Sequence, residues 1–95
     1  HPNEEVNRLE MAMHIQRILT VVTGDESINT KYIGEESRFK DISGNHPGYN
    51  AVALVVDRGL MKPEMDGTFG VSQPVSGPDA LLIIREFQNQ LRQSF

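Results

Sequence analysis

The chain has no cysteine and no tryptophan, and aromatic residues make up only 6% of it. The absence of cysteine excludes disulfides, thiolate metal sites and a cysteine nucleophile. No apolar run approaches the roughly 20 residues that a membrane-spanning helix needs, so the sequence predicts no transmembrane segment. Nine Lys+Arg against 13 Asp+Glu give a net charge of -4. Nucleic acid is therefore excluded as a partner, because binding to a phosphate backbone needs clustered cations.

The sequence also lacks the residue spacings of catalytic and cofactor sites. Neither His14 nor His46 has a second histidine or an acid at a metal-ligand spacing. Ser76 lies outside any G-x-S-x-G pattern, and Asp66-Gly67 lacks the alternating acids of a calcium loop. We expect no catalytic residue, no metal and no cofactor, and hence no enzyme activity. The acidic pair Glu35-Glu36 is expected to lie in a solvated loop.

What is present is enough for one small domain. The 95 residues fall in the usual range for a domain, although a chain of this size buries only about two-thirds of its unfolded surface. Its hydrophobic core must therefore be small, or be completed by a neighbouring domain. The chain begins at His1 and shows no signal peptide, and we interpret it as a piece of a longer protein.

The first predicted helix covers about residues 4–22. Asn7 followed by Glu10 has the spacing of an N-cap with its capping-box partner, and Gly24 is a suitable terminator. The apolar residues recur at helical spacing. They are Ala12, Ile15, Leu19 and Val22, with Leu9, Met11 and Ile18 widening the stripe.

The second predicted helix covers about residues 47–60. Pro47 suits a first helical turn, and Gly59 is expected to end the helix in a left-handed cap with Leu60 folding back onto it. The valines of this segment are also compatible with a buried strand. The preceding proline and the Asp57-Arg58-Gly59 exit favour a helix.

The third predicted helix begins at Ser76 and continues to the end of the chain. Ser76 and Asp79 have cap spacing, and the apolar residues that follow are helically spaced, namely Ala80, Ile83, Ile84, Phe87 and Leu91. The sequence thus predicts a small all-α domain of three helices joined by long ordered loops. Scattered apolar residues, Phe39 and Ile42 among them, would pin the first of these loops to the core.

The starts of the two outer helices echo each other. Val6-Asn7-Arg8-Leu9-Glu10 begins at residue 6, and Val75-Ser76-Gly77-Pro78-Asp79 begins at residue 75, which is 69 residues later. Both have an apolar entry, a capping residue and an acid three positions beyond it. Such an echo is typical of repeat units that cannot bury their own apolar face alone.

A wider series of short motifs resembles one repeat of the S-layer homology (SLH) family. That pattern is approximately F-x-D-h, H-W-A-Y-x-A-I, a G-h-h helix end, D-G-T-F-x-P, and I-T-R-A-E opening a second helix. The matching residues are Phe39-Lys40-Asp41-Ile42, His46-Pro47-Gly48-Tyr49-Asn50-Ala51, Gly59-Leu60-Met61, Asp66-Gly67-Thr68-Phe69 and Pro74-Val75-Ser76. The resemblance covers Phe39 to about Gln90, and residues 6–12 resemble the I-T-R-A-E opening of a preceding repeat whose first half is missing.

The resemblance implies one SLH-like domain over residues 1–95. Residues 1–23 would be the closing helix of a partial repeat, 24–38 a linker and 39–95 a full repeat. SLH modules are helix–loop–helix units that attach exported bacterial proteins to cell-wall polysaccharide at the cell surface. The resemblance makes Arg8 the ligand-binding residue for an anionic sugar, because a helix N-terminus and an arginine together favour a carboxylate. It gives structural roles to Asn7, Glu10, Phe39, Asp41, Asp66, Gly67, Phe69, Ser76 and Asp79.

Two departures from the family pattern leave an alternative open. Gly77 stands where the full repeat would have the arginine, and Pro47 stands where it would have the tryptophan. The alternative is a degenerate SLH-like module for interaction or assembly that binds no sugar and is appended to a secreted hydrolase. A truncated repeat would expose an apolar helix face, which predicts self-association or a neighbouring domain.

Overall fold

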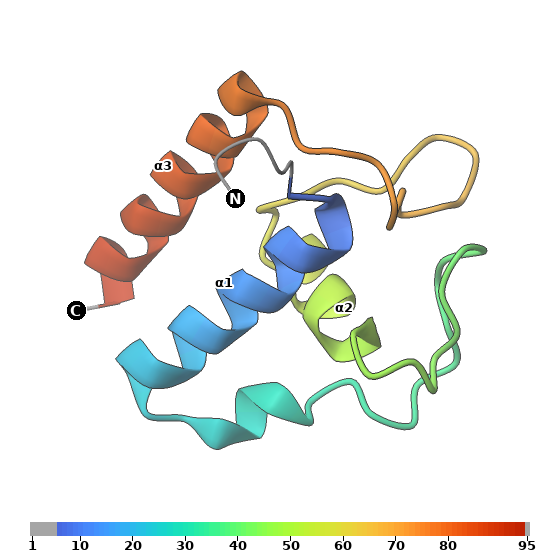
Figure 1. The fold of residues 1–95 in the computed structure, drawn as a ribbon. Helices are drawn as coiled ribbons and strands as arrows, with labels where there is room; N and C mark the ends of the chain where they lie inside the picture. Colours follow the sequence, from blue (N-terminus) through green and yellow to red (C-terminus); the bar gives the residue numbers. More distant parts are fainter. Residues whose placement is uncertain (1–5, 95) are drawn as a thin grey trace.

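The computed structural model describes residues 6–94, and its elements are helices (Figure 1). They are α1 (Arg8–Thr23), the short 3-10 helix η1 (Glu26–Asn29), α2 (Tyr49–Asp57) and α3 (Gly77–Ser94). Over the described residues there is no strand beyond one isolated β-bridge. The predicted all-α fold with three α-helices and long loops is confirmed. The 3-10 helix is an addition, and it lies within the segment 24–38 that the sequence suggested as a linker.

Helix α1 begins and ends at the residues that the sequence singled out. The Asn7 side chain accepts the Glu10 amide at 2.8 Å, and the Glu10 carboxylate accepts the Asn7 amide at 3.1 Å. This reciprocal capping box satisfies two donors that a helix start would otherwise leave unpaired. Gly24, with a φ of 69°, ends the helix in the left-handed conformation that favours glycine. Residues 4 and 5 of the predicted helix lie outside the described residues.

Helix α2 is buried on nearly all sides. Its first seven residues are all buried, namely Tyr49, Asn50, Ala51, Val52, Ala53, Leu54 and Val55. The end of the helix is as predicted, with Gly59 at a φ of 71° and the Leu60 amide donating to the Val55 carbonyl at 2.9 Å. The strand alternative is not realised.

The predicted start of α2 was wrong by two residues. Pro47 lies in the turn ahead of the helix, where the His46 imidazole Nδ1 accepts the Gly48 amide at 2.9 Å. That turn brings α1 and α2 close together. A Cβ placed on Gly48 would come within 2.7 Å of the Leu9 side chain and 3.4 Å of the Met13 sulfur. Glycine at this position therefore allows α1 to cross the start of α2.

The core lies between α1, α2 and the loops that wrap them. Ala12, Ile15 and Leu19 of α1 are buried against the same cluster as α2. The short helix η1 and the loops add large side chains to that cluster, namely Ile28 from η1 and Tyr32, Phe39, Ile42, Leu60, Met61 and Phe69 from the loops. Ile28, Tyr32, Phe39 and Ile42 thus pin the first of the long connections to the core, whereas Ile33 of the same segment is 69% exposed.

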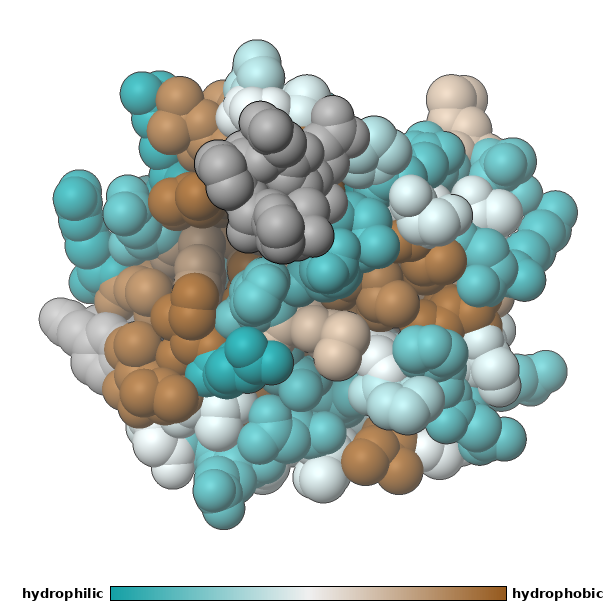
Figure 2. All heavy atoms as spheres, viewed as in Figure 1, coloured by the Kyte–Doolittle hydropathy of each residue, from teal (hydrophilic) through white to brown (hydrophobic). Residues whose placement is uncertain are grey.

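Helix α3 lies to one side of this core (Figure 1). Phe87 is buried, and Ile83 and Leu91 are packed against the core and partly buried. The Gln90 side chain donates to the Arg58 carbonyl at 2.7 Å. Three large apolar side chains of α3 stay exposed, namely Leu81, Leu82 and Ile84. Figure 2 shows apolar side chains reaching the surface on the side where α3 lies.

Candidate functional site

Asp41 fixes the loop that carries the D-G-T-F residues. Its carboxylate accepts three successive backbone amides, from Phe69 and Gly70 at 2.8 Å and from Val71 at 3.0 Å. Partial burial acts to raise the pKa of Asp41, but the three hydrogen bonds outweigh it and lower the pKa below its ordinary value of 3.8. This contact explains why an acid in the 39–42 motif accompanies a turn almost thirty residues later.

Asp66 shapes the turn that precedes these amides. Its carboxylate accepts both the amide and the hydroxyl of Thr68, at 3.0 and 2.7 Å. Gly67 has a φ of 91°, which favours glycine, and its carbonyl accepts the Lys40 amide at 3.0 Å. The two sequence motifs around Asp41 and Asp66 therefore form one hydrogen-bonded unit. The unit is structural, and its acids are engaged with the backbone of the same chain.

Three aromatic rings lie beneath this unit. Phe69 is fully buried, with its ring centroid 5.8 Å from that of Phe39, and the Phe39 ring lies 6.3 Å from that of Tyr49. The guanidinium carbon of Arg8 is 4.6 Å from the Phe69 ring centroid, in cation–π geometry. The start of α1 thus rests on the aromatic core of the 39–81 segment.

Arg8 is the residue that the sequence assigned to an anionic sugar, and its guanidinium makes three polar contacts within the chain in addition to the one with the Phe69 ring. Nε donates to the Phe69 carbonyl at 2.8 Å, and a terminal nitrogen donates to the Lys62 carbonyl. The Glu64 carboxylate lies 4.0 Å from Nε. The Arg8 side chain is 17% exposed. It ties α1 to the loop after α2, and its sugar-binding role stays a prediction.

The two echoing segments lie beside each other. Asn7 and Pro74 form an antiparallel β-bridge, and the Val75 amide donates to the Val6 carbonyl at 2.8 Å. The Arg8 amide donates to the Gln73 carbonyl at 2.9 Å. The equivalent entry residues Val6 and Val75 are therefore joined directly. The echo that appeared in the sequence as a repeated helix start is a pairing of two helix starts in space.

The start of α3 is simpler than that of α1. The Ser76 hydroxyl accepts the Asp79 amide at 3.2 Å, so the serine caps this helix. Gly77 occupies the position equivalent to Arg8, and a Cβ placed on it would meet no atom within 4 Å. At this position α3 therefore has neither a charged side chain nor the contacts that Arg8 makes.

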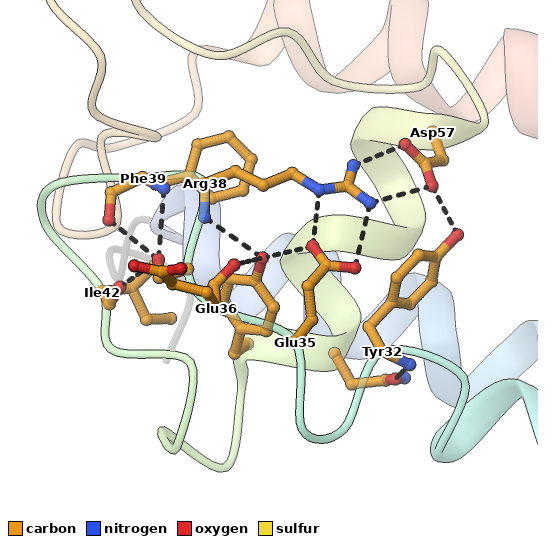
Figure 3. A network of polar contacts seen from close by, with 10 residues as sticks. Tyr32, Glu35, Glu36, Arg38, Phe39, Ile42 and Asp57 are labelled. Carbon is orange, nitrogen blue, oxygen red and sulfur yellow. Dashed lines mark hydrogen bonds and ion pairs between the residues drawn. The ribbon is translucent and has the colours of Figure 1, made fainter.

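A charged network was missed by the sequence reasoning (Figure 3). The Arg38 guanidinium bonds the Glu35 carboxylate at 2.5 Å and the Asp57 carboxylate at 2.6 Å. The Tyr49 hydroxyl donates to Glu35 at 2.7 Å, and the Tyr32 hydroxyl donates to Asp57 at 2.7 Å. Glu35 and Glu36 lie in a solvent-accessible loop as expected, but the Glu35 side chain also joins this loop to Tyr49 at the start of α2.

The network lowers the pKa values of its carboxylates and raises that of Tyr32. Hydrogen bonds from Arg38, then from a tyrosine hydroxyl, lower the pKa of both Asp57 and Glu35. Burial, followed by the hydrogen bond to Asp57, raises the pKa of Tyr32 to about 12. These groups hold each other in their charged or neutral forms around neutral pH, and the network serves to hold the 32–38 loop on α2.

One further polar residue in the core was not foreseen. Asn50 is 4% exposed, and its amide nitrogen donates to Gln16 of α1 at 2.6 Å and to the Ile28 carbonyl at 2.7 Å. Its oxygen accepts the Tyr32 amide at 2.7 Å. A single buried asparagine thus joins α2 both to α1 and to the 28–32 segment. The signal available in the sequence was one polar residue within an otherwise apolar helix.

A cleft of about 580 Å³ lies between the starts of α1 and α3 and the loop that follows α2. Its polar lining residues are Arg8, Lys62, Glu64, Gln73 and Asp79. Pro63, Pro74, Leu82 and Ile83 supply apolar surface. Among the described residues no group of three or more histidine or acidic side chains could hold a metal ion. The cleft can offer hydrogen bonds and charge, which suits the recognition of a polar ligand.

Comparison with known families agrees with this geometry. Residues 38–81 match the model of the S-layer homology domain. The match begins beside the Asp41 motif and ends in the first turns of α3, so it spans the hydrogen-bonded unit described above. No match to a curated protein or to a solved structure was found for the chain.

Residues 38–81 therefore form an S-layer homology domain, as the motifs predicted. Domains of this family are non-catalytic modules that anchor exported proteins at the cell surface. Within residues 6–94, no helix has the length and the apolar character that crossing a membrane requires.

Proposed function

We propose that the chain anchors an exported bacterial protein to the cell envelope by binding cell-wall polysaccharide. The observation that carries the proposal is the S-layer homology domain at residues 38–81, which belongs to a family of surface anchors. In the same proposal, residues 1–23 are the closing helix of one repeat, 24–38 a linker and 39–95 a complete repeat. The pairing of Val6 with Val75 supports this organisation, because equivalent segments of neighbouring repeats are expected to meet.

The cleft between the starts of α1 and α3 is the proposed polysaccharide site. Arg8 and Lys62 place two positive charges on its wall, near the N-terminal end of α1, and the same lining also contains the acids Glu64 and Asp79. Carboxylates are favoured at such a position, because the positive end of the α1 dipole and cationic side chains act together. Arg8 keeps a small exposed fraction while it holds the loop, and the Lys62 side chain is exposed. The ligand class proposed for the part of the cleft formed by Arg8 and Lys62 is an acidic sugar polymer.

Lys62 allows the site to be tested without disturbing the fold. Its carbonyl accepts from Arg8, and this contact survives a change of side chain. We expect Lys62→Gln to weaken binding to purified cell-wall polysaccharide about fivefold, measured by isothermal titration calorimetry, because a charge-assisted contact contributes about 1 kcal/mol at a partly exposed site.

Lys31→Gln is the matched control. This residue is an exposed lysine beside Tyr32, outside the cleft, and its loss changes the net charge by the same amount. It should leave the affinity unchanged. Equal losses in the two variants would show that only net charge matters, and the absence of binding by the folded chain would remove the polysaccharide from the proposal.

The second candidate function is an interaction or assembly module without sugar binding. Two observations at the positions where the family pattern has an arginine favour it. The Arg8 guanidinium already contacts two backbone carbonyls and the Phe69 ring, and the equivalent position in the second helix start is Gly77. Sedimentation velocity would support this candidate if the chain associates with itself or with a protein partner while calorimetry detects no polysaccharide binding.

A further inference from the structure

Glu64 is the acid that is paired with Arg8 in the cleft. Its carboxylate oxygen Oε1 lies 4.0 Å from Arg8 Nε, and no other ion pair among residues 6–94 involves Arg8. This distance is too long for a hydrogen bond, so charge alone joins the two groups. Within the same residues the Glu64 carboxylate accepts no hydrogen bond. The pair is therefore a loose one, in contrast to the hydrogen-bonded pairs of the Arg38 network.

The backbone of Glu64 is held in place, whereas its side chain is not. The Glu64 amide donates to the Thr68 carbonyl at 2.8 Å, and the Glu64 carbonyl accepts the Gly67 amide at 3.3 Å. The side chain is 40% exposed, and its Oε1 lies 3.3 Å from the point that a Cβ on Gly70 would occupy. The loop thus keeps a carboxylate on the wall of the cleft, and this carboxylate can leave Arg8 without disturbing the backbone.

The other partners of Arg8 do not compensate its charge. The Phe69 and Lys62 carbonyls that accept from the guanidinium are neutral groups, and so is the Phe69 ring. The guanidinium has further N–H donors besides those that the two carbonyls use. Within residues 6–94, Glu64 is therefore the side chain that balances the charge on which a ligand carboxylate would act.

We propose that Glu64 is an internal competitor of the acidic ligand at Arg8 and thereby lowers the affinity of the cleft for acidic sugars. The inference rests on the proposed function and names a residue that regulates the same site. Two carboxylates beside one guanidinium repel each other, because like charges at this separation interact appreciably at a partly exposed site. The ligand must therefore displace the Glu64 side chain. That displacement breaks no hydrogen bond, so binding stays possible but becomes weaker.

Asp79 provides the matched comparison within the cleft. It is an exposed acid at the start of α3 that lines the same cleft, and it forms no ion pair within residues 6–94. Neutralising Asp79 changes the net charge of the cleft by the same amount as neutralising Glu64. The Arg8–Glu64 pair stays intact in the first case and is lost in the second, so the two changes separate pairing from net charge.

The affinities of these two variants test the proposal. The probes are purified cell-wall polysaccharide and oligogalacturonate, which is a chemically defined acidic sugar. In isothermal titration calorimetry, Glu64→Gln should bind both probes about three- to tenfold more tightly than the parent chain, because the repulsion is removed. Asp79→Asn should gain less than about twofold, because its charge is not paired with Arg8. Equal gains would mean that only net charge matters and would overturn the proposal.

A double-mutant comparison locates the effect at Arg8. The gain from Glu64→Gln should persist in a Lys62→Gln background, because Glu64 is paired with Arg8 and not with Lys62. It should disappear in an Arg8→Gln background, and a gain that survives there would overturn the proposal. Should Arg8→Gln unfold the chain, the Lys62→Gln background and Asp79→Asn decide the question, since both leave the contacts of α1 in place.

Thermal unfolding separates competition from a structural role. Glu64→Gln should change the melting temperature by less than about 2 °C, because a partly exposed pair without a hydrogen bond contributes little to stability. A larger fall would make Glu64 a structural partner of Arg8 and overturn the proposal.

The competition and the anchoring function fail in different ways. If oligogalacturonate follows the expected order of variants while cell-wall polysaccharide does not bind, anchoring is refuted and the role of Glu64 is supported. Polysaccharide binding that Glu64→Gln leaves unchanged would keep the anchoring function and overturn the role of Glu64. If neither probe binds to any variant, both are overturned.

Discussion

The two helix starts share a sequence pattern but are held in place very differently. At α1, the amides of Arg8 and Leu9 donate to the 71–73 loop, and the Arg8 side chain reaches the Phe69 and Lys62 carbonyls. At α3, Ser76 caps the helix while Gly77 leaves open space at the position of the arginine. The cap defines where each helix begins, whereas the residue after the cap decides what the helix is attached to.

The difference extends to what each helix contributes to stability. Helix α1 is part of the central core with α2, and α3 is added to it mainly through Phe87 and its neighbours. An element with few buried side chains opens at low free-energy cost compared with the core. The comparison therefore predicts two levels of stability in one small domain, and the following changes test it in order of decreasing effect.

Phe69→Ala should destabilise the whole domain by about 3–5 kcal/mol, because it empties a fully buried site beneath Arg8 and Phe39. Urea unfolding followed by circular dichroism measures the loss.

Phe87→Ala is the counterpart on α3, and it should speed amide hydrogen exchange in α3 while the α1 and α2 amides stay protected. Equal acceleration in α1 and α3 would contradict the two levels of stability.

Asp41→Asn should cost about 2 kcal/mol at neutral pH, because it weakens three hydrogen bonds to a charged acceptor. The folded-state pKa of Asp41 lies below the ordinary 3.8, so its contribution is fully present above about pH 5 and is lost as the pH falls through the folded-state pKa. The variant should therefore lose part of the acid dependence of the free energy of unfolding. An unchanged pH profile of unfolding, measured from pH 2 to 7, would assign that dependence to other acids.

Arg8→Lys should destabilise the domain by about 1–2 kcal/mol, because lysine keeps the charge but cannot form both carbonyl contacts while stacking on Phe69. Arg17→Lys is the matched control on the exposed side of the same helix, and it should change the free energy of unfolding by less than about 0.5 kcal/mol. Similar values for the two variants would show that the Arg8 contacts contribute nothing.

Gly77→Ala should stabilise α3 by about 0.5–1 kcal/mol, the smallest of these effects. Gly77 has open space at its Cβ and no positive φ, so alanine gains helix propensity without strain. Gly24→Ala is the opposite case, because its φ of 69° makes alanine unfavourable although its surroundings are equally open. Thermal unfolding should show a higher melting temperature for Gly77→Ala and a lower one for Gly24→Ala. Shifts of the same sign would contradict the different backbone conformations of the two glycines.

Local sequence patterns predicted those features that depend on neighbouring residues. The Asn7–Glu10 capping box, the Gly24 and Gly59 helix ends and the burial of α2 all follow from short-range spacing and are present in the structure. Contacts between distant segments were beyond such patterns. Nothing near Glu35 indicated that a loop acid would meet Tyr49 and Arg38. The start of α2 was misplaced because a proline in a turn and a proline in a first helical turn look alike in sequence.

The sequence by itself determined the fold class and the family of residues 38–81, because helix periodicity, caps and glycine ends are local and because the SLH motifs are short. Only the tertiary structure decided what those motifs do. It showed Asp41 holding the D-G-T-F loop by its amides, and it joined the two echoing helix starts through Val6 and Val75. It also placed the Arg8 guanidinium on internal carbonyls and left one face of α3 open. These outcomes depend on contacts between segments that are far apart in the sequence, and short sequence motifs do not show which segments will meet.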